Sequence, residues 1–110
     1  MMKKISIDEF ISRVNERKSV SRFDVELGFK WGKTESEKLC SIDLSYAYLH
    51  GVDFGGADLH GANLRGADLS YADLSYANFN GADLHGANFH NADLRYITGA
   101  KVKVIGLKKK

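Results

Sequence analysis

Apolar residues recur at every fifth position through the middle of this chain. A triplet of alanine, aspartate or asparagine, and leucine or phenylalanine occurs eight times without a gap, beginning at Ala57. Three looser copies precede this run and are centred on Leu44, Leu49 and Phe54. Because a fixed short period is the signature of a repeat architecture, the pattern identifies residues 42–96 as eleven tandem units of five residues.

A period of five excludes both an α-helix and a straight strand. In an α-helix, five residues advance by about 500°, which would scatter the leucines around the axis. In a straight strand, side chains alternate between faces, so an odd period would send successive leucines to opposite sides. If the backbone turns a corner within each unit, every alanine and every central leucine or phenylalanine returns to one interior. The predicted core ladder consists of Leu44, Leu49, Phe54, Leu59, Leu64, Leu69, Leu74, Phe79, Leu84, Phe89 and Leu94.

The residue that ends each unit suits a corner. Glycine, tyrosine or asparagine fills this place at Gly51, Gly56, Gly61, Gly66, Tyr71, Tyr76, Gly81, Gly86 and Asn91. Glycine and asparagine tolerate left-handed backbone angles, and the Asp or Asn before each central residue can accept a hydrogen bond from a nearby turn amide.

Tandem units of the form A(D/N)LXX resemble the pentapeptide-repeat family, and this match covers half of the chain. The resemblance implies a right-handed quadrilateral parallel β-helix with four units in each coil, so that eleven units give about three coils. The expected fold class is therefore an all-β solenoid with a small N-terminal α+β cap.

The first forty residues follow other periods. Residues 7–17 have helical spacing of apolar residues, with Ser6 as N-cap and Glu9 completing a capping box. Residues 20–31 alternate apolar and polar side chains as a half-buried strand does, at Phe23, Val25, Leu27, Phe29 and Trp31. We expect residues 1–40 to form a helix-and-strand cap, residues 41–98 the repeat, and residues 99–110 a terminal strand with a basic tail. A partner-binding role for residues 1–40 is the alternative to capping.

Charge divides along these boundaries. Residues 41–98 carry seven Asp against two Arg, whereas residues 99–110 carry five Lys and no acidic residue. The basic tail suggests the hypothesis that Lys108, Lys109 and Lys110 bind phosphate backbones or an anionic membrane. A solvated tail is the simpler interpretation.

The candidate chemistry does not favour an enzyme. The four histidines, His50, His60, His85 and His90, each follow a central Leu or Phe and should point outward, so we predict no metal site. No Ser/His/Asp set or phosphate-binding loop stands out, and we predict no catalytic residues and no cofactor. Cys40 is the only cysteine and is interpreted as a small apolar filler. Asp8 and Glu9 lie where a signal peptide needs apolar residues, so we expect a cytoplasmic protein.

The predicted function is a non-enzymatic protein-interaction module. Its candidate binding surface comprises Asp53, Asp73, Asp93, Tyr71, Tyr76 and Tyr96, because exposed tyrosines near fixed charges are common in binding patches. The resemblance adds an alternative, since some pentapeptide-repeat proteins imitate DNA and bind type II topoisomerases. It also implies dimerisation through the C-terminal end.

Overall fold

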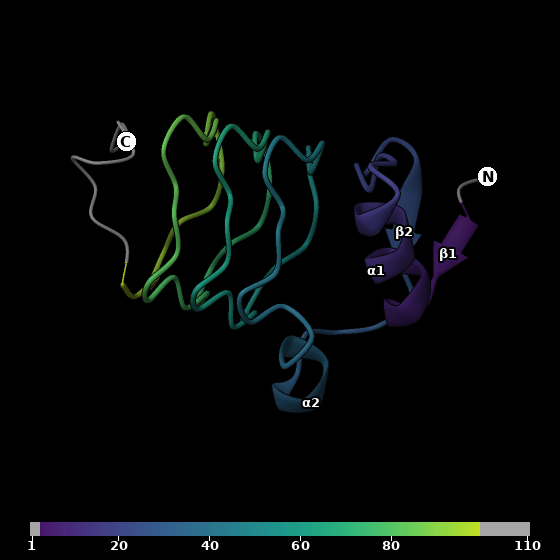
Figure 1. The fold of residues 1–110 in the computed structure, drawn as a ribbon, viewed down its shortest axis with the longest axis horizontal. Helices are drawn as coiled ribbons and strands as arrows, with labels where there is room; N and C mark the ends of the chain where they lie inside the picture. The colour runs from purple at the N-terminus through teal and green to yellow at the C-terminus, as the bar shows by residue number, and fades with distance from the viewer. Residues whose placement is uncertain (1–2, 100–110) are drawn as a thin grey trace.

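The structure is a computed structural model and describes residues 3–99. Four short elements precede the repeat: β1 (Lys3–Ile5), α1 (Ile7–Asn15), β2 (Val25–Leu27) and α2 (Lys33–Ser36). Beyond α2 the chain winds through stacked loops, drawn in teal to yellow in Figure 1, and β1, α1 and β2 lie at the N-terminal end of this stack. No helix in the described part of the chain is long and apolar enough to cross a membrane.

The stacked loops are joined by parallel backbone bridges between residues twenty positions apart. Asp53 bridges Asp73, which in turn bridges Asp93, and the same spacing holds for every bridge in the repeat. Each twenty-residue step, called a coil below, therefore contains four five-residue units. The β-helix solenoid expected from the repeat is confirmed.

Backbone hydrogen bonds tie successive coils together. In one unit the amide of Asn63 donates to the carbonyl of Ile42 at 2.8 Å, and the amide of Leu64 donates to the carbonyl of Asp83 at 2.8 Å. The amide of Ala67 closes the corner by donating to the carbonyl of Leu64 at 3.1 Å. The backbone polar groups are thus paired without long strands.

The interior of the solenoid is filled by the central residues and the alanines. Ten of the eleven predicted ladder side chains are buried, and Ala57, Ala62, Ala67, Ala72 and Ala77 are fully enclosed beside them. Leu94 departs from the prediction because it is only partly buried. Leu74, one coil earlier, is covered on both sides and fully buried, whereas no described residue stands one coil beyond Leu94.

All nine predicted corner residues have left-handed backbone angles, with φ between 57° and 74°. The Asp or Asn three residues before each corner residue accepts the expected amide bond. Ser75 N donates to Asp73 Oδ1 at 3.0 Å, for example, and ten units from Asp43 to Asp93 repeat this bond.

The N-terminal helix agrees closely with its prediction. Helix α1 is capped by Ser6, whose Oγ accepts a hydrogen bond from the amide of Glu9 at 3.2 Å, and it buries Phe10 and Val14. It ends at Asn15, two residues before the predicted boundary. Its buried face is directed at the solenoid, because the Phe10 ring lies 5.9 Å from the ring of Phe54.

The predicted strand over residues 20–31 is wrong over most of its length. Only β2 is a strand, and Phe23 is 63% exposed. Ser21 bends the chain before β2, since Phe23 N donates to its side-chain Oγ at 3.0 Å and Val25 N donates to its backbone carbonyl at 3.0 Å. Strand β2 pairs in parallel with β1, a pairing that the sequence analysis did not predict.

Residues before the repeat bind the edge of the first coil. Arg22 N donates to the carbonyl of His50 at 2.8 Å, and Trp31 Nε1 donates to the carbonyl of Asp53 at 2.8 Å. These bonds use first-coil carbonyls that no earlier coil could pair.

We expect Leu69→Asp to abolish folding. The Leu69 side chain is fully buried, so the change removes about 2–5 kcal/mol of packing and adds an unpaired buried charge, against a total stability of about 5–15 kcal/mol. Circular dichroism and thermal unfolding measure the outcome. Asn80→Asp adds the same charge at an exposed position and should leave the melting curve nearly unchanged. A folded Leu69→Asp protein with a normal melting temperature would contradict the inward assignment.

The carboxyl group of Asp83 provides a test of contacts between coils. Hydrogen bonds from the side chain of His85 and then from that of Arg65, one coil away, lower the pKa of Asp83 from 3.8 to about 2. A lowered pKa means that these contacts stabilise the fold above pH 3.8 and lose their effect as the pH falls towards 2. A carboxyl ¹³C titration by NMR should give a midpoint of about 2. Arg65→Gln and His85→Gln should each raise the midpoint, whereas Lys38→Gln, which removes a charge that contacts Asp8 and does not contribute to the shift at Asp83, should not move it.

Candidate interaction surfaces

The three candidate aspartates form one column along the solenoid. Asp53, Asp73 and Asp93 occupy bridged positions in successive coils. Asp53 Oδ1 accepts the amide of Gly55 at 2.9 Å, and Arg95 binds Asp93 through two bonds of 2.9 and 2.7 Å. The side-chain bond from Arg95 is the main cause that lowers the pKa of Asp93. An acid that must hold a proton near neutral pH needs a raised pKa, so the lowered pKa of Asp93 favours a charged surface group over an acid catalyst at that position.

Tyr76 and Tyr96 form an exposed aromatic pair beside this column. Their ring centroids lie 4.9 Å apart with an interplanar angle of 20°, and the residues are 66% and 69% exposed. Each follows a column aspartate by three positions and has a left-handed φ, 64° and 63°. The corner backbone therefore directs both rings outward from adjacent coils.

Tyr71 belongs to a different aromatic group. Its ring lies 5.3 Å from the ring of His50 and 5.8 Å from that of His90, and the His50 ring stacks on Phe23 at 4.5 Å. The structure thus separates Tyr71 from the Tyr76–Tyr96 pair, with which the sequence analysis had grouped it.

The structure brings Asp68, Ser70 and His50 together, the residue types of a hydrolase triad. Ser70 Oγ donates to Asp68 Oδ1 at 2.6 Å, and His50 Nδ1 lies 2.9 Å from Ser70 Oγ. Because the hydroxyl proton is directed at Asp68, Ser70 Oγ accepts from His50 instead of giving its proton to it. A nucleophilic serine requires the reverse order, and Ser70 is also buried. The three residues form a structural network between coils.

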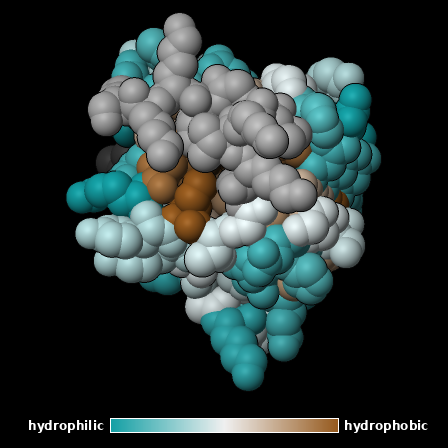
Figure 2. Space-filling view, turned by 90° about the vertical axis from the view of Figure 1, so that its left-hand side faces the viewer, coloured by the Kyte–Doolittle hydropathy of each residue, from teal (hydrophilic) through white to brown (hydrophobic). Residues whose placement is uncertain are grey.

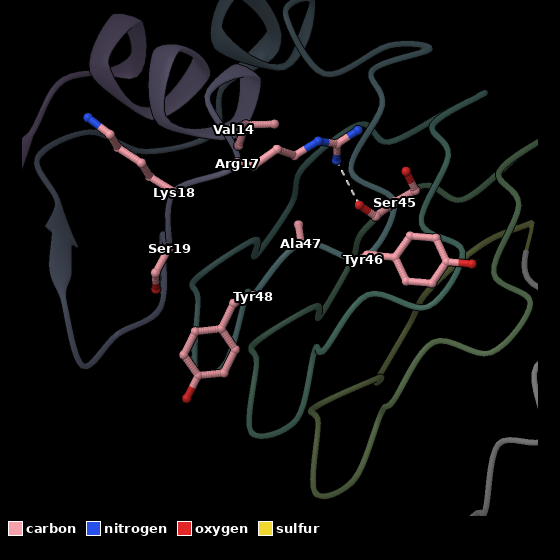
Figure 3. A pocket seen from close by; sticks show the side chains of 8 residues that line it. All are labelled: Val14, Arg17, Lys18, Ser19, Ser45, Tyr46, Ala47 and Tyr48. Atoms are coloured by element: carbon pink, nitrogen blue, oxygen red, sulfur yellow. Dashed lines mark hydrogen bonds between the residues drawn. The ribbon is translucent and has the colours of Figure 1, made fainter.

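A hollow of about 480 Å³ separates the residues that follow α1 from the first coil (Figure 3). Arg17 Nη1 donates to the Ser45 carbonyl at 2.8 Å, and Arg17 Nη2 contacts Asp43 Oδ2 at 3.1 Å. Tyr46 and Tyr48 extend from the first coil on either side of Ala47. The Arg17 charge is therefore compensated, and the hollow offers aromatic and hydroxyl groups to a ligand.

Cys40, Asp58 and His60 converge where the segment after α2 meets the repeat. One potential ligand atom from each residue lies within 4.8 Å of the others. Burial, followed by the charges of Asp58 and Glu37, raises the pKa of the Cys40 thiol. The sequence analysis missed this cluster because Cys40 lies outside the repeat, where the five-residue register assigns no position.

Two predictions fall outside the described residues. These are the basic tail of Lys108, Lys109 and Lys110 and the terminal strand beyond Gly99.

Comparison with known proteins supports the repeat assignment. The family model for pentapeptide repeats matches residues 42–75 and 62–95, with eight copies. A crystal structure of a pentapeptide repeat protein from Nostoc Pcc 7120 is similar to this chain, with 25% sequence identity, 99% of this chain and all of that chain covered, and a TM-score of 0.39. No curated protein matches the chain. On the strength of the repeat match, this chain belongs to the pentapeptide-repeat family.

Proposed function

We propose that this protein is a non-enzymatic interaction module that presents a rigid surface to a protein partner. Pentapeptide-repeat proteins are generally interaction modules without catalytic activity. The observation that carries the proposal is the stacked, exposed pair of Tyr76 and Tyr96 beside the aspartate column. Aromatic side chains that are already ordered lose little conformational entropy when they bind a partner.

The proposed scaffold is a right-handed quadrilateral β-helix of about three coils, with residues 1–40 as its cap. Bridges at a constant spacing of twenty residues support this architecture. Contacts of Phe10 and Trp31 with the first coil support capping by the N-terminal segment. A scaffold of this kind fixes the spacing of surface groups along the column.

The chemistry of this surface favours a partner with a basic and partly apolar face. Seven Asp against two Arg give residues 41–98 a net charge of −5. Complementary charge would accelerate association, and the tyrosine rings would supply the buried contact.

The test is affinity capture from host extract with the full chain as bait, followed by calorimetry with the captured protein. Tyr76→Gly/Tyr96→Gly removes both rings and preserves the corners, because glycine fills this place in six other units. We expect the affinity for the true partner to fall at least about tenfold, since ordered aromatic anchors each contribute more than about 1 kcal/mol. Tyr46→Gly removes a ring that is at least as exposed, from another corner, and should not change the affinity. Equal affinity of the unchanged chain, the Tyr76→Gly/Tyr96→Gly protein and the Tyr46→Gly protein would contradict the proposed surface.

An alternative function is imitation of DNA towards a type II topoisomerase, and the acidic repeat supports it. The basic residues that flank the repeat on both sides weigh against it, because they oppose the charge of a DNA mimic. A gyrase supercoiling assay separates the two functions. Inhibition, or protection from a quinolone, at micromolar protein would favour DNA imitation, and no effect would remove it.

Binding of nucleic acid or an anionic surface through Lys108, Lys109 and Lys110 is the second alternative. It predicts steep salt dependence and loss of binding when these three residues are deleted.

A homodimer through the C-terminal end is also proposed. Figure 2 shows an apolar patch on this end of the molecule. Leu94 and Ile97 of the last described coil are only partly buried, whereas Leu74 and Ala77, one coil earlier, are fully enclosed. Light scattering at high micromolar concentration decides between monomer and dimer.

A further inference from the structure

The cluster of Cys40, Asp58 and His60 combines three kinds of metal ligand. A thiol, a carboxylate and an imidazole each offer one atom, and these atoms lie within 4.8 Å of one another. Their separation along the chain shows that the fold creates the cluster, because Cys40 precedes the repeat and the other two belong to its fourth unit.

The backbone on both sides of the cluster is held in place. Asp58 N donates to Ser36 Oγ at 3.1 Å, and Ser41 N donates to the His60 carbonyl at 3.0 Å. Cys40 lies between these two bonds, and its Sγ contacts the Ser36 carbonyl at 3.7 Å. Two fixed points five residues apart, Ser36 and Ser41, thus position the thiol against the repeat.

The dimensions suit a tetrahedral cation after small side-chain rotations. Zinc binds sulfur at about 2.3 Å and nitrogen or oxygen at about 2.0–2.2 Å, which places its ligand atoms about 3.5 Å apart. His60 Nδ1 is already 3.9 Å from Asp58 Oδ1, and the His60 side chain is 57% exposed. Asp58 Oδ1 also accepts a bond from Asn78 Nδ2 at 3.1 Å, which orients the carboxylate.

An internal comparison separates this cluster from the ordinary surface of the repeat. The unit Ala-Asp-Leu-His-Gly occurs twice, at residues 57–61 and 82–86. In the second copy, His85 Nδ1 approaches Asp83 Oδ1 to 2.8 Å and Arg65 binds the other carboxylate oxygen at 3.0 Å. That copy is closed by its own hydrogen bonds. In the first copy the His–Asp distance is longer and the third neighbour is a thiol instead of a cation.

We propose that Cys40, Asp58 and His60 form a three-ligand site for a thiophilic divalent cation, with Zn²⁺ as the best match. Thiolate and imidazole select zinc over magnesium or calcium, which require oxygen ligands. Three protein ligands leave the fourth position to water or to a group from a partner. A bound cation would join the segment after α2 to the repeat.

The test is titration of the untagged full-length chain with Co²⁺ and then Zn²⁺. Co²⁺ should produce a thiolate-to-cobalt charge-transfer band with visible bands of four-coordinate geometry, and Zn²⁺ should displace it. Cys40→Ser should abolish the charge-transfer band. Asp58→Asn and His60→Gln should each weaken Zn²⁺ binding by more than the roughly 10- to 100-fold that loss of an outer hydrogen-bond partner costs.

The second copy of the unit supplies the matched control. His85→Gln changes the same residue in the same five-residue sequence and should leave Zn²⁺ affinity unchanged. Asp58→Asn should preserve the fold because asparagine fills this place at Asn63, Asn78 and Asn88, and His60 is exposed. Absence of the charge-transfer band at saturating Co²⁺, or equal Zn²⁺ affinities of the His60→Gln and His85→Gln proteins, would overturn the proposal.

Discussion

One left-handed residue in every five is the constraint on which this structure depends. Without the positive φ at each corner, successive central residues would alternate between faces, and no common interior could form. With it, leucines one coil apart stack, and backbone groups twenty residues apart come within hydrogen-bonding distance. The Asp or Asn within each unit stabilises the same corner through its bond to the amide two residues later. Core, intercoil pairing and corner are therefore consequences of one local conformation.

The identity of the corner residues then carries information about function. A left-handed backbone costs most side chains about 1–2 kcal/mol, and glycine avoids this cost at six corners of the repeat. Tyrosine nevertheless fills the corners at residues 46, 71, 76 and 96. None of these rings is buried, so packing in the interior does not explain them. Stacking between Tyr76 and Tyr96 offsets part of the cost, but glycine would be the simpler solution for stability. The exposure of Tyr76 and Tyr96 on a strained backbone supports the binding surface proposed for this pair.

The repeat could be predicted from the sequence because every unit faces nearly the same environment. The inward positions of Leu44 to Phe89 and the left-handed corners follow from periodicity alone. Outside the repeat, local patterns failed where side-chain hydrogen bonds competed with them. Alternation predicted a strand through Phe23, but Ser21 accepts the Phe23 amide and bends the chain. The pairing of β1 with β2 joins residues more than twenty positions apart, for which a single sequence gives no signal.

A regular solenoid places equivalent residues in equivalent surroundings. A distinctive set of ligand groups therefore forms most readily where a nonrepetitive segment contacts the repeat. The two Ala-Asp-Leu-His-Gly units illustrate this, since they have identical sequences and differ in their neighbours. Asp83 and His85 form a hydrogen-bonded cluster with Arg65 from the repeat, whereas Asp58 and His60 face Cys40 from the preceding segment. The hollow around Arg17 and the contact of Trp31 with Asp53 lie along the same junction. Contacts with the N-terminal segment therefore give units of identical sequence different surroundings.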